Sequence, residues 1–541
     1  MYRSLPILSL IAALIVLPTN AAGQPPAPEE PQAVSLTERI DGVFAIGVHA
    51  LDAVLFWSPV EVVQTQDGER LRVLGLPSDL VPVDSATGAP AAQGVPLVVL
   101  VLLLGALGFT LYNRFINVRA FGHSLRVIRG DYDNPSDKGE ISHFQALTSA
   151  LSATVGLGNI AGVAIAVGTG GPGAVFWMLL AASLGMTSKF VECSLAQFYR
   201  RFDPDGTVHG GPMYYISIGL RERGWPTLGR ITALVFAVFC IGGSLGGGNM
   251  FQANQAGQQI ADEIPFLGSG LGPHMVGIGL ALLVGMVIIG GIRRIGEVTS
   301  KVVPFMCAGY VLAGLYIVFA NIGQVPSVVA TIFSEAFSFD AGFGGFLGIM
   351  VTGIRRAVFS NEAGVGSAAI AHSAARTEWP IREGVVASIG PFIDTILICL
   401  MTAMVVIVTG AHESPDAGSG VSMTSWAFAS VFPWFPKLLT VAVVLFAYST
   451  MISWSYYGEK ATAYLFGHGR GVQLAYRVLF LFFVYLGAVT SLDNVLDFSD
   501  LMILSMAFPN IVGMLILAPM VLRRSDEYMA KLRAGEFKVY R

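Results

Sequence analysis

The segment 154–162 is the part of the chain whose residue types and spacing are best suited to binding chemistry. It reads TVGLGNIAG, with three glycines and Asn159 inside an otherwise apolar stretch. Such a composition makes a poor continuous helix. At membrane depth, non-helical backbone is tolerated where it is buried in protein or lines a watery cavity. The freed N–H groups can bind a carboxylate, and the freed carbonyl oxygens can bind a hard cation such as Na⁺. The alternative is that these glycines only allow close helix packing.

The elements that would position this segment are membrane helices. The chain has 541 residues, of which 54% are hydrophobic and 13% are charged, whereas soluble domains carry about 25% charged residues. A net charge of −4 and the lack of basic tracts, phosphate loops and zinc-spaced Cys/His sets give no indication of nucleic-acid binding or of an organic cofactor. The cysteines lie in apolar segments and are expected to be buried thiols without disulfides: Cys193, Cys240, Cys307 and Cys399.

Eleven apolar segments are long enough to cross a bilayer, which needs about 20 residues. They are expected near 95–113, 143–166, 172–198, 229–252, 274–292, 301–321, 342–360, 385–410, 436–458, 473–490 and 499–522. If the first runs inward, the later Lys and Arg residues, including Arg355 and Arg356, fall at inner ends and loops, and Lys437 alone falls in an outer loop. The positive-inside rule supports this orientation. It makes 95–522 a transmembrane domain and 523–541 a cytoplasmic tail.

The first 94 residues are expected to lie before the bundle. Residues 1–22 combine a basic start, a short apolar core and small residues, as in a secretory signal peptide. A retained N-terminal helix is the alternative. Residues 23–94 then form an external leader, with an amphipathic interfacial helix at 36–57 and a small external insert at 58–94.

Four stretches carry a resemblance to a known family. The run 155–159, VGLGN, resembles the first core helix of neurotransmitter:sodium symporters. Residues 142–215 more closely resemble the alanine/glycine:cation (sodium:alanine) symporter family, and GGGNMFQAN (246–254), RRAVFSNEAGVGSAAIAHSAA (355–375) and STMISWSYYGEKA (449–461) agree. The resemblance covers about 95–525.

This resemblance implies an all-α polytopic protein with the leucine-transporter-type fold. Its five-plus-five inverted repeats would span 142–321 and 342–522, with 95–113 as an extra N-terminal helix. Each repeat is expected to begin with an interrupted helix. In the second repeat the predicted break is 348–353, which contains Gly348 and Gly353.

The resemblance also implies residue roles. The predicted substrate site consists of Gly156, Gly158, Asn159, Gln252 and Trp454, with Trp454 walling a small pocket. The predicted Na⁺ site consists of Ser152, Val155, Ala447 and Thr450. Each side chain also has a structural alternative: Gln252 can bridge helices, Trp454 can pack, and Thr450 can bond its own helix backbone. The family's fold relatives carry an outer-gate Arg where this chain has Gly162, so that gate cannot form from this position.

Other polar residues lie within or at the ends of the predicted spans. Asp394 lies within an apolar helix and is either a structural acceptor or a proton or ion element. Lys189 and Glu192 are expected to pair or to extend toward the membrane surface, and Asn361 and Glu362 to form a cytoplasmic gate or cap. The histidines lie in loops or near span ends and are not expected to cluster in the bundle.

The function expected from the resemblance is Na⁺-coupled symport of a small neutral amino acid, L-alanine or glycine, by alternating access. The protein would be a multi-pass plasma-membrane carrier, with a bacterial inner membrane as the expected setting, and not an enzyme. Na⁺ is the expected coupling ion, without an organic cofactor. The alternatives are a proton-coupled carrier of the same substrates and a non-transporting amino-acid sensor with a carrier fold. Composition and spacing leave the oligomeric state and the exact substrate open.

Overall fold

The computed structural model describes residues 56–65, 68–73, 92–288, 291–339 and 342–540. The predicted signal peptide and nearly all of the predicted amphipathic helix lie outside these residues. So does much of the insert at 58–94.

Helices make up most of the described chain. Those of the first half are α3 Leu97–Tyr112, α4 Ile116–Arg119, α5 Phe121–Ile128, α6 His143–Thr154, π-helical η2 Gly158–Gly162, α7 Val163–Gly170, α8 Gly173–Tyr199, α9 Pro212–Glu222, α10 Pro226–Leu245, π-helical η3 Gly246–Met250, α11 Phe251–Glu263, 3₁₀ turn η4 Pro265–Leu267, α12 Gly272–Ile288 and α13 Gly291–Ala320. Those of the second half are 3₁₀ turn η5 Ile322–Gln324, α14 Val325–Ala336, α15 Gly342–Asn361, α16 Ala368–His372, α17 Pro380–Ala387, π-helical η6 Phe392–Cys399, α18 Leu400–Val408, 3₁₀ turns η7 Ala411–Glu413 and η8 Pro415–Ala417, α19 Val421–Ala429, α20 Phe435–Phe466, α21 Arg470–Val489, α22 Leu492–Ser505 and α23 Ala507–Arg533.

The helical, polytopic fold class is confirmed. Seven helices of the described residues are long and apolar enough to cross a membrane, and α6 with η2–α7 forms an eighth, bent by 55°. Two more predicted segments, α3 and α12, are shorter apolar helices of 16 and 17 residues, and α15 fills another predicted range. The count of eleven spans therefore stays a prediction.

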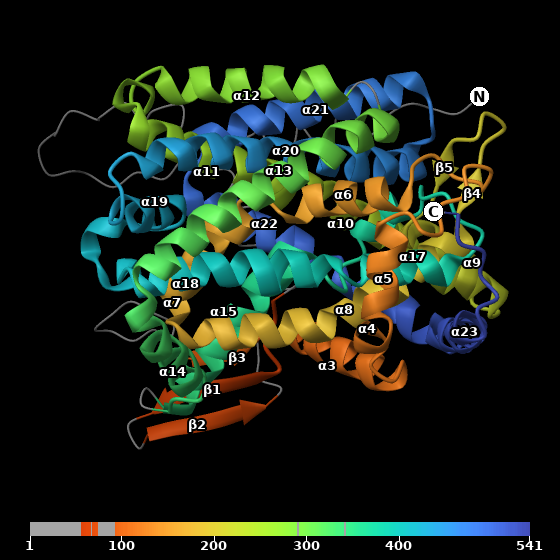
Figure 1. Ribbon diagram of the computed structural model, residues 1–541, viewed down its shortest axis with the longest axis horizontal. Coiled ribbons are helices and arrows are strands. Elements are labelled where there is room, and N and C mark those ends of the chain that lie inside the picture. The colour runs from red at the N-terminus through yellow and green to blue at the C-terminus, as the bar shows by residue number, and fades with distance from the viewer. Residues whose placement is uncertain (1–55, 66–67, 74–91, 289–290, 340–341, 541) are drawn as a thin grey trace, which may run out of the picture.

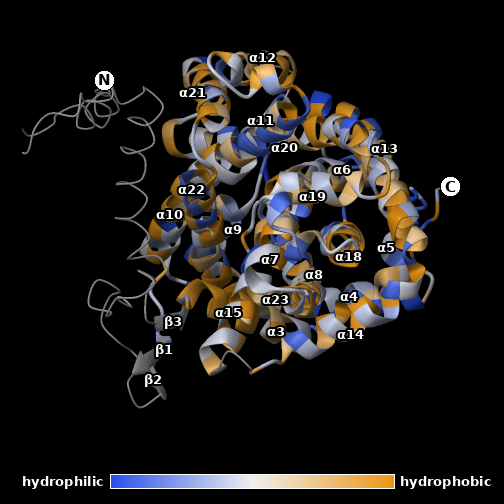
Figure 2. Ribbon diagram, turned by 90° about the vertical axis from the view of Figure 1, so that its left-hand side faces the viewer, coloured by the Kyte–Doolittle hydropathy of each residue, from blue (hydrophilic) through white to orange (hydrophobic). Residues whose placement is uncertain are grey.

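The two ends of the bundle differ in what they carry. The helices α9 and α17 and the strands β4 Arg201–Phe202 and β5 Val208–His209 gather at one end, and α14, α19 and the N-terminal strands lie at the other (Figure 1). We name these the inner and outer ends, after the orientation that the positive charges predict. Between them, α12 and α13 are rich in hydrophobic residues (Figure 2). Both helices carry large exposed apolar side chains, as lipid contact requires: Leu282 is 67% and Phe305 77% exposed.

The insert at 58–94, expected to be a small external element, contains strands. The strands β1 Val60–Thr65, β2 Gly68–Val73 and β3 Ala92–Val95 form an antiparallel sheet in the order β2-β1-β3. In its register, Val60 pairs with Val73 on one side and Val95 on the other. The sheet lies beside α15 and leads directly into α3.

The predicted break at 348–353 is wrong, because α15 is a continuous helix through these residues. A Cβ atom on Gly353 would clash with the carbonyl of Ala174 and the side chain of Trp177. This glycine therefore allows α15 to pack closely on α8. The interruption comes later, between Asn361 and Ala368, where Glu362, Gly364 and Gly366 have φ angles of 56°, 86° and 91°. A non-glycine residue rarely adopts the conformation of Glu362.

The close packing at Gly353 yields a stability prediction. Replacing Gly353 with Ala should push α15 away from α8 and cost about 1–3 kcal/mol, the usual range for overpacking. The measurement is the melting temperature of the purified protein in detergent. Gly108→Ala is the matched control, because a Cβ at this position of α3 meets nothing within 4 Å. Equal melting temperatures for the two variants would contradict the packing role of Gly353.

Candidate functional site

The helix break predicted at 154–162 is present. The helix α6 begins with a capping box in which the Ser142 hydroxyl accepts from the Gln145 N–H, and the Gln145 side chain accepts from the Ser142 N–H. It ends at Thr154, and the chain turns through 55° before continuing at Gly158. All residues from 155 to 167 are buried, so the freed backbone groups must find partners within the protein.

Two predicted substrate residues supply these partners. The Gly156 N–H donates to Asn159 Oδ1 at 2.9 Å, and the Leu157 N–H donates to Gln252 Oε1 at 2.9 Å. Gln252 is held in turn, because its Nε2 donates to the Gly247 carbonyl at 2.8 Å. The break thus presents two adjacent N–H groups that now bind side-chain amide oxygens. A substrate carboxylate offers the same kind of acceptor.

Three π-helical segments meet around this break. Asn159 lies in η2, Gln252 is the second residue after η3, and Asp394 lies in η6. Insertions of this kind often occur at functional sites, since they turn side chains and free backbone groups. The glycine run 246–248 is a sequence signal for η3, whereas the apolar residues of η6 give no comparable signal.

Two residues of the predicted Na⁺ site, Ser152 of α6 and Thr450 of the facing helix α20, are in contact. Thr450 Oγ1 donates to the Ser152 carbonyl at 3.0 Å, and Ser152 Oγ donates to the Ser449 carbonyl at 2.7 Å. Val155 and Ala447 are both fully buried. A Cβ atom on Gly156 would clash with Thr450 Oγ1, so glycine is needed there for α6 and α20 to approach. Oxygen atoms are the ligands that Na⁺ prefers.

Trp454 lies one turn further along α20 and is 1% exposed. Its indole ring packs on Gly248, where a Cβ would overlap the ring. Its Nε1 donates to Glu362 Oε1 at 3.0 Å. Glu362 was expected to belong to a cytoplasmic gate or cap. The structure instead places it at the second helix break, in contact with the residue predicted to wall the pocket.

Asp394 joins the first break to the second half of the chain. Its carboxylate accepts from Asn159 Nδ2 at 2.7 Å, Ser360 Oγ at 2.9 Å and Thr395 Oγ1 at 2.7 Å. Three donors suit an ionised acceptor, which fits the structural interpretation of Asp394. Sequence reasoning missed Ser360 and Thr395. In the sequence, Ser360 is distinguished only by its position before Asn361 in the family-like stretch, and Thr395 only by its position after Asp394.

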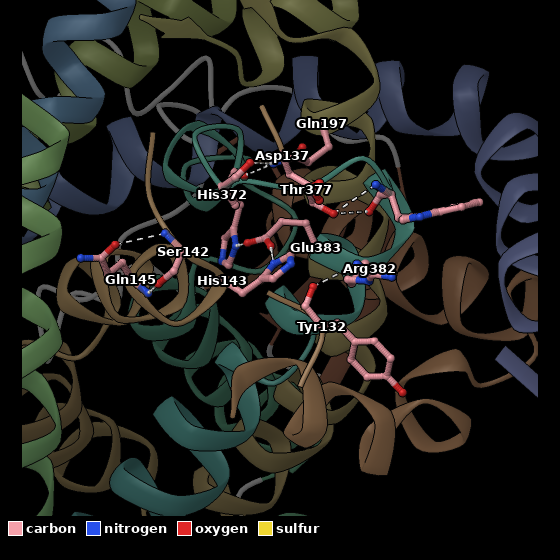
Figure 3. A network of polar contacts seen from close by, with 12 residues as sticks. Tyr132, Asp137, Ser142, His143, Gln145, Gln197, His372, Thr377, Arg382 and Glu383 are labelled. Carbon is pink, nitrogen blue, oxygen red and sulfur yellow. Dashed lines mark hydrogen bonds and ion pairs between the residues drawn. The ribbon is translucent and has the colours of Figure 1, made fainter. Parts of the chain in front are cut away.

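His143 and His372 lie at helix ends, as expected, but the fold brings them together at the inner end. His143 Nδ1 and His372 Nδ1 both contact the carboxylate of Glu383, the latter at 2.5 Å, and all three side chains are buried (Figure 3). They come from the start of α6, the end of α16 and the start of α17. His143 and Glu383 are 240 residues apart in sequence, so spacing alone cannot pair them. The cluster holds together the inner ends of both broken helices.

Further contacts close this inner end. Arg200, after α8, donates to the carbonyls of Thr377 at 2.8 Å and Ala375 at 2.5 Å, and Gln197 Nε2 donates to the His372 carbonyl at 2.5 Å. Figure 3 shows Gln197 and Thr377 above the histidine–glutamate cluster. Among the residues that the structure describes, no group of three or more His, Cys, Asp or Glu side chains could hold a metal ion.

Arg355 and Arg356 do not lie at an inner loop, which corrects their place in the charge pattern. Both guanidinium groups contact the carboxylate of Asp500 in α22, the Arg355 contact at 3.0 Å. The helix α22 begins at the outer end, beside the hollow described below. Arg356 and Asp500 are buried. These contacts of Arg355 and Arg356 with Asp500 thus join α15 to α22 on the outer side of the second break. They do so although this chain has Gly162 at the position where the fold relatives carry an outer-gate arginine.

A hollow of about 650 Å³ opens at the outer end above the buried site. It is lined by polar residues, among them Asn254, Gln255, Gln258, His274 and Thr490. Gln255 lies one turn after Gln252 on α11. Since Gln252, Thr450 and Trp454 are at most 3% exposed, the hollow is separated from the breaks by packed side chains.

A bundle of membrane-crossing helices with oxygen-rich broken helices at its centre is the architecture of a secondary transporter. The sequence profile described as "Sodium:alanine symporter family" matches residues 86–541. The chain is 41% identical to the sodium/alanine symporter AgcS of Methanococcus maripaludis, over 81% of this chain and 95% of the relative. It is 34% identical to the probable sodium/glutamine symporter GlnT of Bacillus subtilis, over 82% of this chain and 90% of the relative. The chain belongs to the sodium:alanine symporter family, and it is a multi-pass protein of the plasma membrane.

Similarity to solved structures is weaker. The crystal structure of MhsT in complex with L-phenylalanine aligns with 72% of this chain and 99% of that chain, with a TM-score of 0.46 and 14% identity. The family membership therefore rests on sequence.

The tight contact at Gly156 predicts a binding defect. Gly156→Ala should push Thr450 Oγ1 away from the Ser152 carbonyl and weaken binding of L-alanine in Na⁺ at least about tenfold, which corresponds to ~1.4 kcal/mol. The measurement is equilibrium binding to the purified protein. Gly162→Ala is the matched control, because the nearest atom to a Cβ there is 3.9 Å away. Equal loss in both variants would show that helix propensity, not this contact, is responsible.

The contacts of Glu383 with His143 and His372 predict that loss of this carboxylate destabilises the inner end locally. A glutamine at position 383 cannot accept from both imidazoles with full strength, so one buried donor loses its partner at a cost of about 1–3 kcal/mol. Glu383→Gln should therefore raise amide hydrogen exchange in peptides covering 141–146 and 368–375. Glu378→Gln serves as a control near the same loop. Unchanged exchange in both peptides would exclude a closing role for the cluster.

Proposed function

We propose that the chain carries a small neutral amino acid, L-alanine or glycine, into the cell together with Na⁺ by alternating access. The observation that carries the proposal is the meeting of Thr450 Oγ1 and the Ser152 carbonyl at the break of a membrane-buried helix. The two oxygens belong to different helices. A cation bound between them stabilises one arrangement of α6 and α20 over others, which is how ion binding is coupled to a conformational change.

The substrate carboxylate binds the N–H groups of Gly156 and Leu157. In the closed state these groups are bonded to the side-chain oxygens of Asn159 and Gln252. A carboxylate that displaces the two amides exchanges neutral acceptors for a charged one, and charge-assisted hydrogen bonds are about twice as strong. Asn159 and Gln252 then become free to contact the ligand or a neighbouring ion.

The size of the substrate is limited by Trp454. Its ring fills the space above Gly248, and Glu362 fixes its orientation through Nε1. Two relatives support a substrate without net charge, since their names specify alanine and glutamine. Because these names specify different amino acids, they do not by themselves select the substrate. We choose alanine and glycine because the Trp454 ring leaves room only for a small side chain.

Alternating access requires a closure on each side of the site. The contacts of Arg355 and Arg356 with Asp500 form the outer closure, between the hollow and the second break. The cluster of His143, His372 and Glu383 forms the inner closure. Both are present together, so the structure corresponds to an occluded state. The protein acts by moving its substrate and does not convert it chemically.

The ion site is tested by Thr450→Ala in proteoliposomes. We expect uptake of radiolabelled L-alanine to require an inward Na⁺ gradient, and the substitution to raise the Na⁺ concentration for half-maximal uptake at least about tenfold, because an oxygen ligand is lost. Thr450→Ser keeps the hydroxyl and should stay near the parent value. Thr462→Ala, three turns further along the same helix, controls for loss of a threonine.

Two outcomes would redirect the proposal. Equal uptake with Na⁺ and with K⁺ alone, but increased uptake with an inward H⁺ gradient, would favour the proton-coupled alternative. Saturable alanine binding without flux under any gradient would favour the sensor.

A further inference from the structure

A buried carboxylate at the second helix break has no part in the proposed Na⁺ site. Glu362 is 1% exposed and lies between α15 and α16 with a φ angle of 56°. Its Oε1 accepts from Trp454 Nε1 at 3.0 Å, and its Oε2 accepts from the Ser367 hydroxyl. Burial of a carboxylate and a positive φ angle each cost free energy of folding, so a residue with both is a candidate for a functional role.

The charges around this break do not balance. Four buried ionisable groups surround this break: Lys189 and Glu192 from α8, Glu362, and Asp394 from η6. Lys189 and Glu192 lie 3.6 Å apart, Asn510 links Glu192 to the Gly364 carbonyl, and Ser360, two residues before Glu362, donates to Asp394. Three carboxylates against one ammonium leave two negative charges when all are ionised. An uncompensated charge in a low-dielectric interior is costly, and proteins neutralise it or pair it. One Na⁺ near Thr450 removes one of the two charges, and the second needs another cation.

We propose that this second cation is a proton bound to Glu362 Oε2, so that each transport cycle moves H⁺ together with Na⁺ and the amino acid. The inference rests on the proposed function, which it extends by a second coupling ion and its site. In the proton-bound step an O–H bond forms at Oε2, and the Ser367 hydroxyl turns from donor to acceptor. The proton enters from the outer solution and leaves to the inner one, so no other reactant is required.

The hydrogen bonds of Glu362 are compatible with both of its states. The Trp454 indole can only donate, so Oε1 stays an acceptor whether or not the residue is protonated. A serine hydroxyl both donates and accepts, so Ser367 suits a carboxylate or a carboxylic acid at Oε2. The donors to Glu362 are neutral.

The other two carboxylates are less suited to this role. Glu192 Oε1 lies 3.6 Å from the Lys189 ammonium, and its other oxygen accepts from Asn510 Nδ2 at 3.0 Å. Asp394 accepts from three donors, which stabilise its ionised form. The remaining ionisable groups in electrostatic reach of Glu362 are Cys240 and Tyr457. Both are neutral in ordinary solution.

Protonation of Glu362 is linked to the substrate site through Trp454. A bond from the indole to a carboxylate is stronger than one to a carboxylic acid, so the proton loosens the ring that walls the pocket. The same helix carries Thr450 one turn earlier. Na⁺ binding at Thr450 and proton binding beside Trp454 therefore both act on α20.

Buried polar groups continue from this break toward the inner end. Asn510 Nδ2 donates to the Gly364 carbonyl at 2.9 Å as well as to Glu192, and Tyr215 of α9 donates to Asn510 Oδ1. Within the described chain, Lys189 Nζ, Glu192 Oε1 and Tyr457 OH are buried without a hydrogen-bond partner. These side chains reach from the second break to α9 at the inner end, and we assign the release of the proton to this route.

The test uses the full-length protein in proteoliposomes that contain a pH-sensitive dye. Adding L-alanine with an inward Na⁺ gradient should acidify the lumen in step with uptake, with about one proton per alanine. In Glu362→Gln, the Na⁺-dependent exchange of alanine that remains should no longer acidify the lumen. Its exchange should also vary less than about twofold between about pH 6 and about pH 8. Glu459→Gln removes a carboxylate elsewhere on α20, paired with Arg477, and should keep the acidification.

A second variant protects the test against misfolding of the first. Ser367→Ala removes the hydroxyl at Oε2 and should move the pH midpoint of alanine uptake upward by about one unit, because the ionised carboxylate loses a donor. Na⁺-driven uptake without acidification in the parent protein, or acidification that persists in Glu362→Gln, would overturn the inference while leaving the proposed function intact. A parent protein without Na⁺-driven uptake would overturn the proposed function itself.

Discussion

The constraint on which the structure depends is that a helix broken inside a membrane must have its freed backbone groups satisfied by the protein. The chain turns by 55° between Thr154 and Gly158, at full burial. Asn159 and Gln252 bind the freed N–H groups, and Thr450 binds a freed carbonyl. Three elements distant in sequence are thereby fixed at one point. In the function we propose, a substrate carboxylate and Na⁺ bind these same groups, so that ligand binding and the closed structure use the same atoms.

At the second break, the partners of the backbone and side-chain groups include a carboxylate, Glu362, whereas amide side chains bind the freed N–H groups of the first break. Asn510 binds the Gly364 carbonyl, and Glu362 links the break to Trp454. Asp394 connects the two breaks through Asn159 and Ser360. The centre of the bundle is therefore a polar network in a low-dielectric surrounding, where an unpaired group is costly and a paired one is specific. The contacts at Glu383 and at Asp500, which we propose as the inner and outer closures, each join helices that are distant in sequence.

Glycines show both the reach and the limit of interpretation from sequence. The run at 154–162 was predicted to be a break and is one, because Asn159 accompanies its glycines and can bind the freed N–H groups. The glycines at 348 and 353 were also predicted to be a break, but α15 is continuous there. The same residue type serves close approach of two helices at Gly353 and a left-handed turn at Gly364 and Gly366. Only the neighbouring helix distinguishes these uses, since composition is the same in both.

The sequence by itself determined the helical membrane fold, the first break, the family and the residues predicted to bind substrate and Na⁺. These follow from apolar length, local composition and long matching motifs, all of which are properties of contiguous residues. Only the tertiary structure decided that Glu362 contacts Trp454, that His143 and His372 share Glu383, and that Arg355 and Arg356 meet Asp500. The physical reason is that these pairs join helices separated by many residues, so their proximity depends on how the helices pack, which no local pattern encodes.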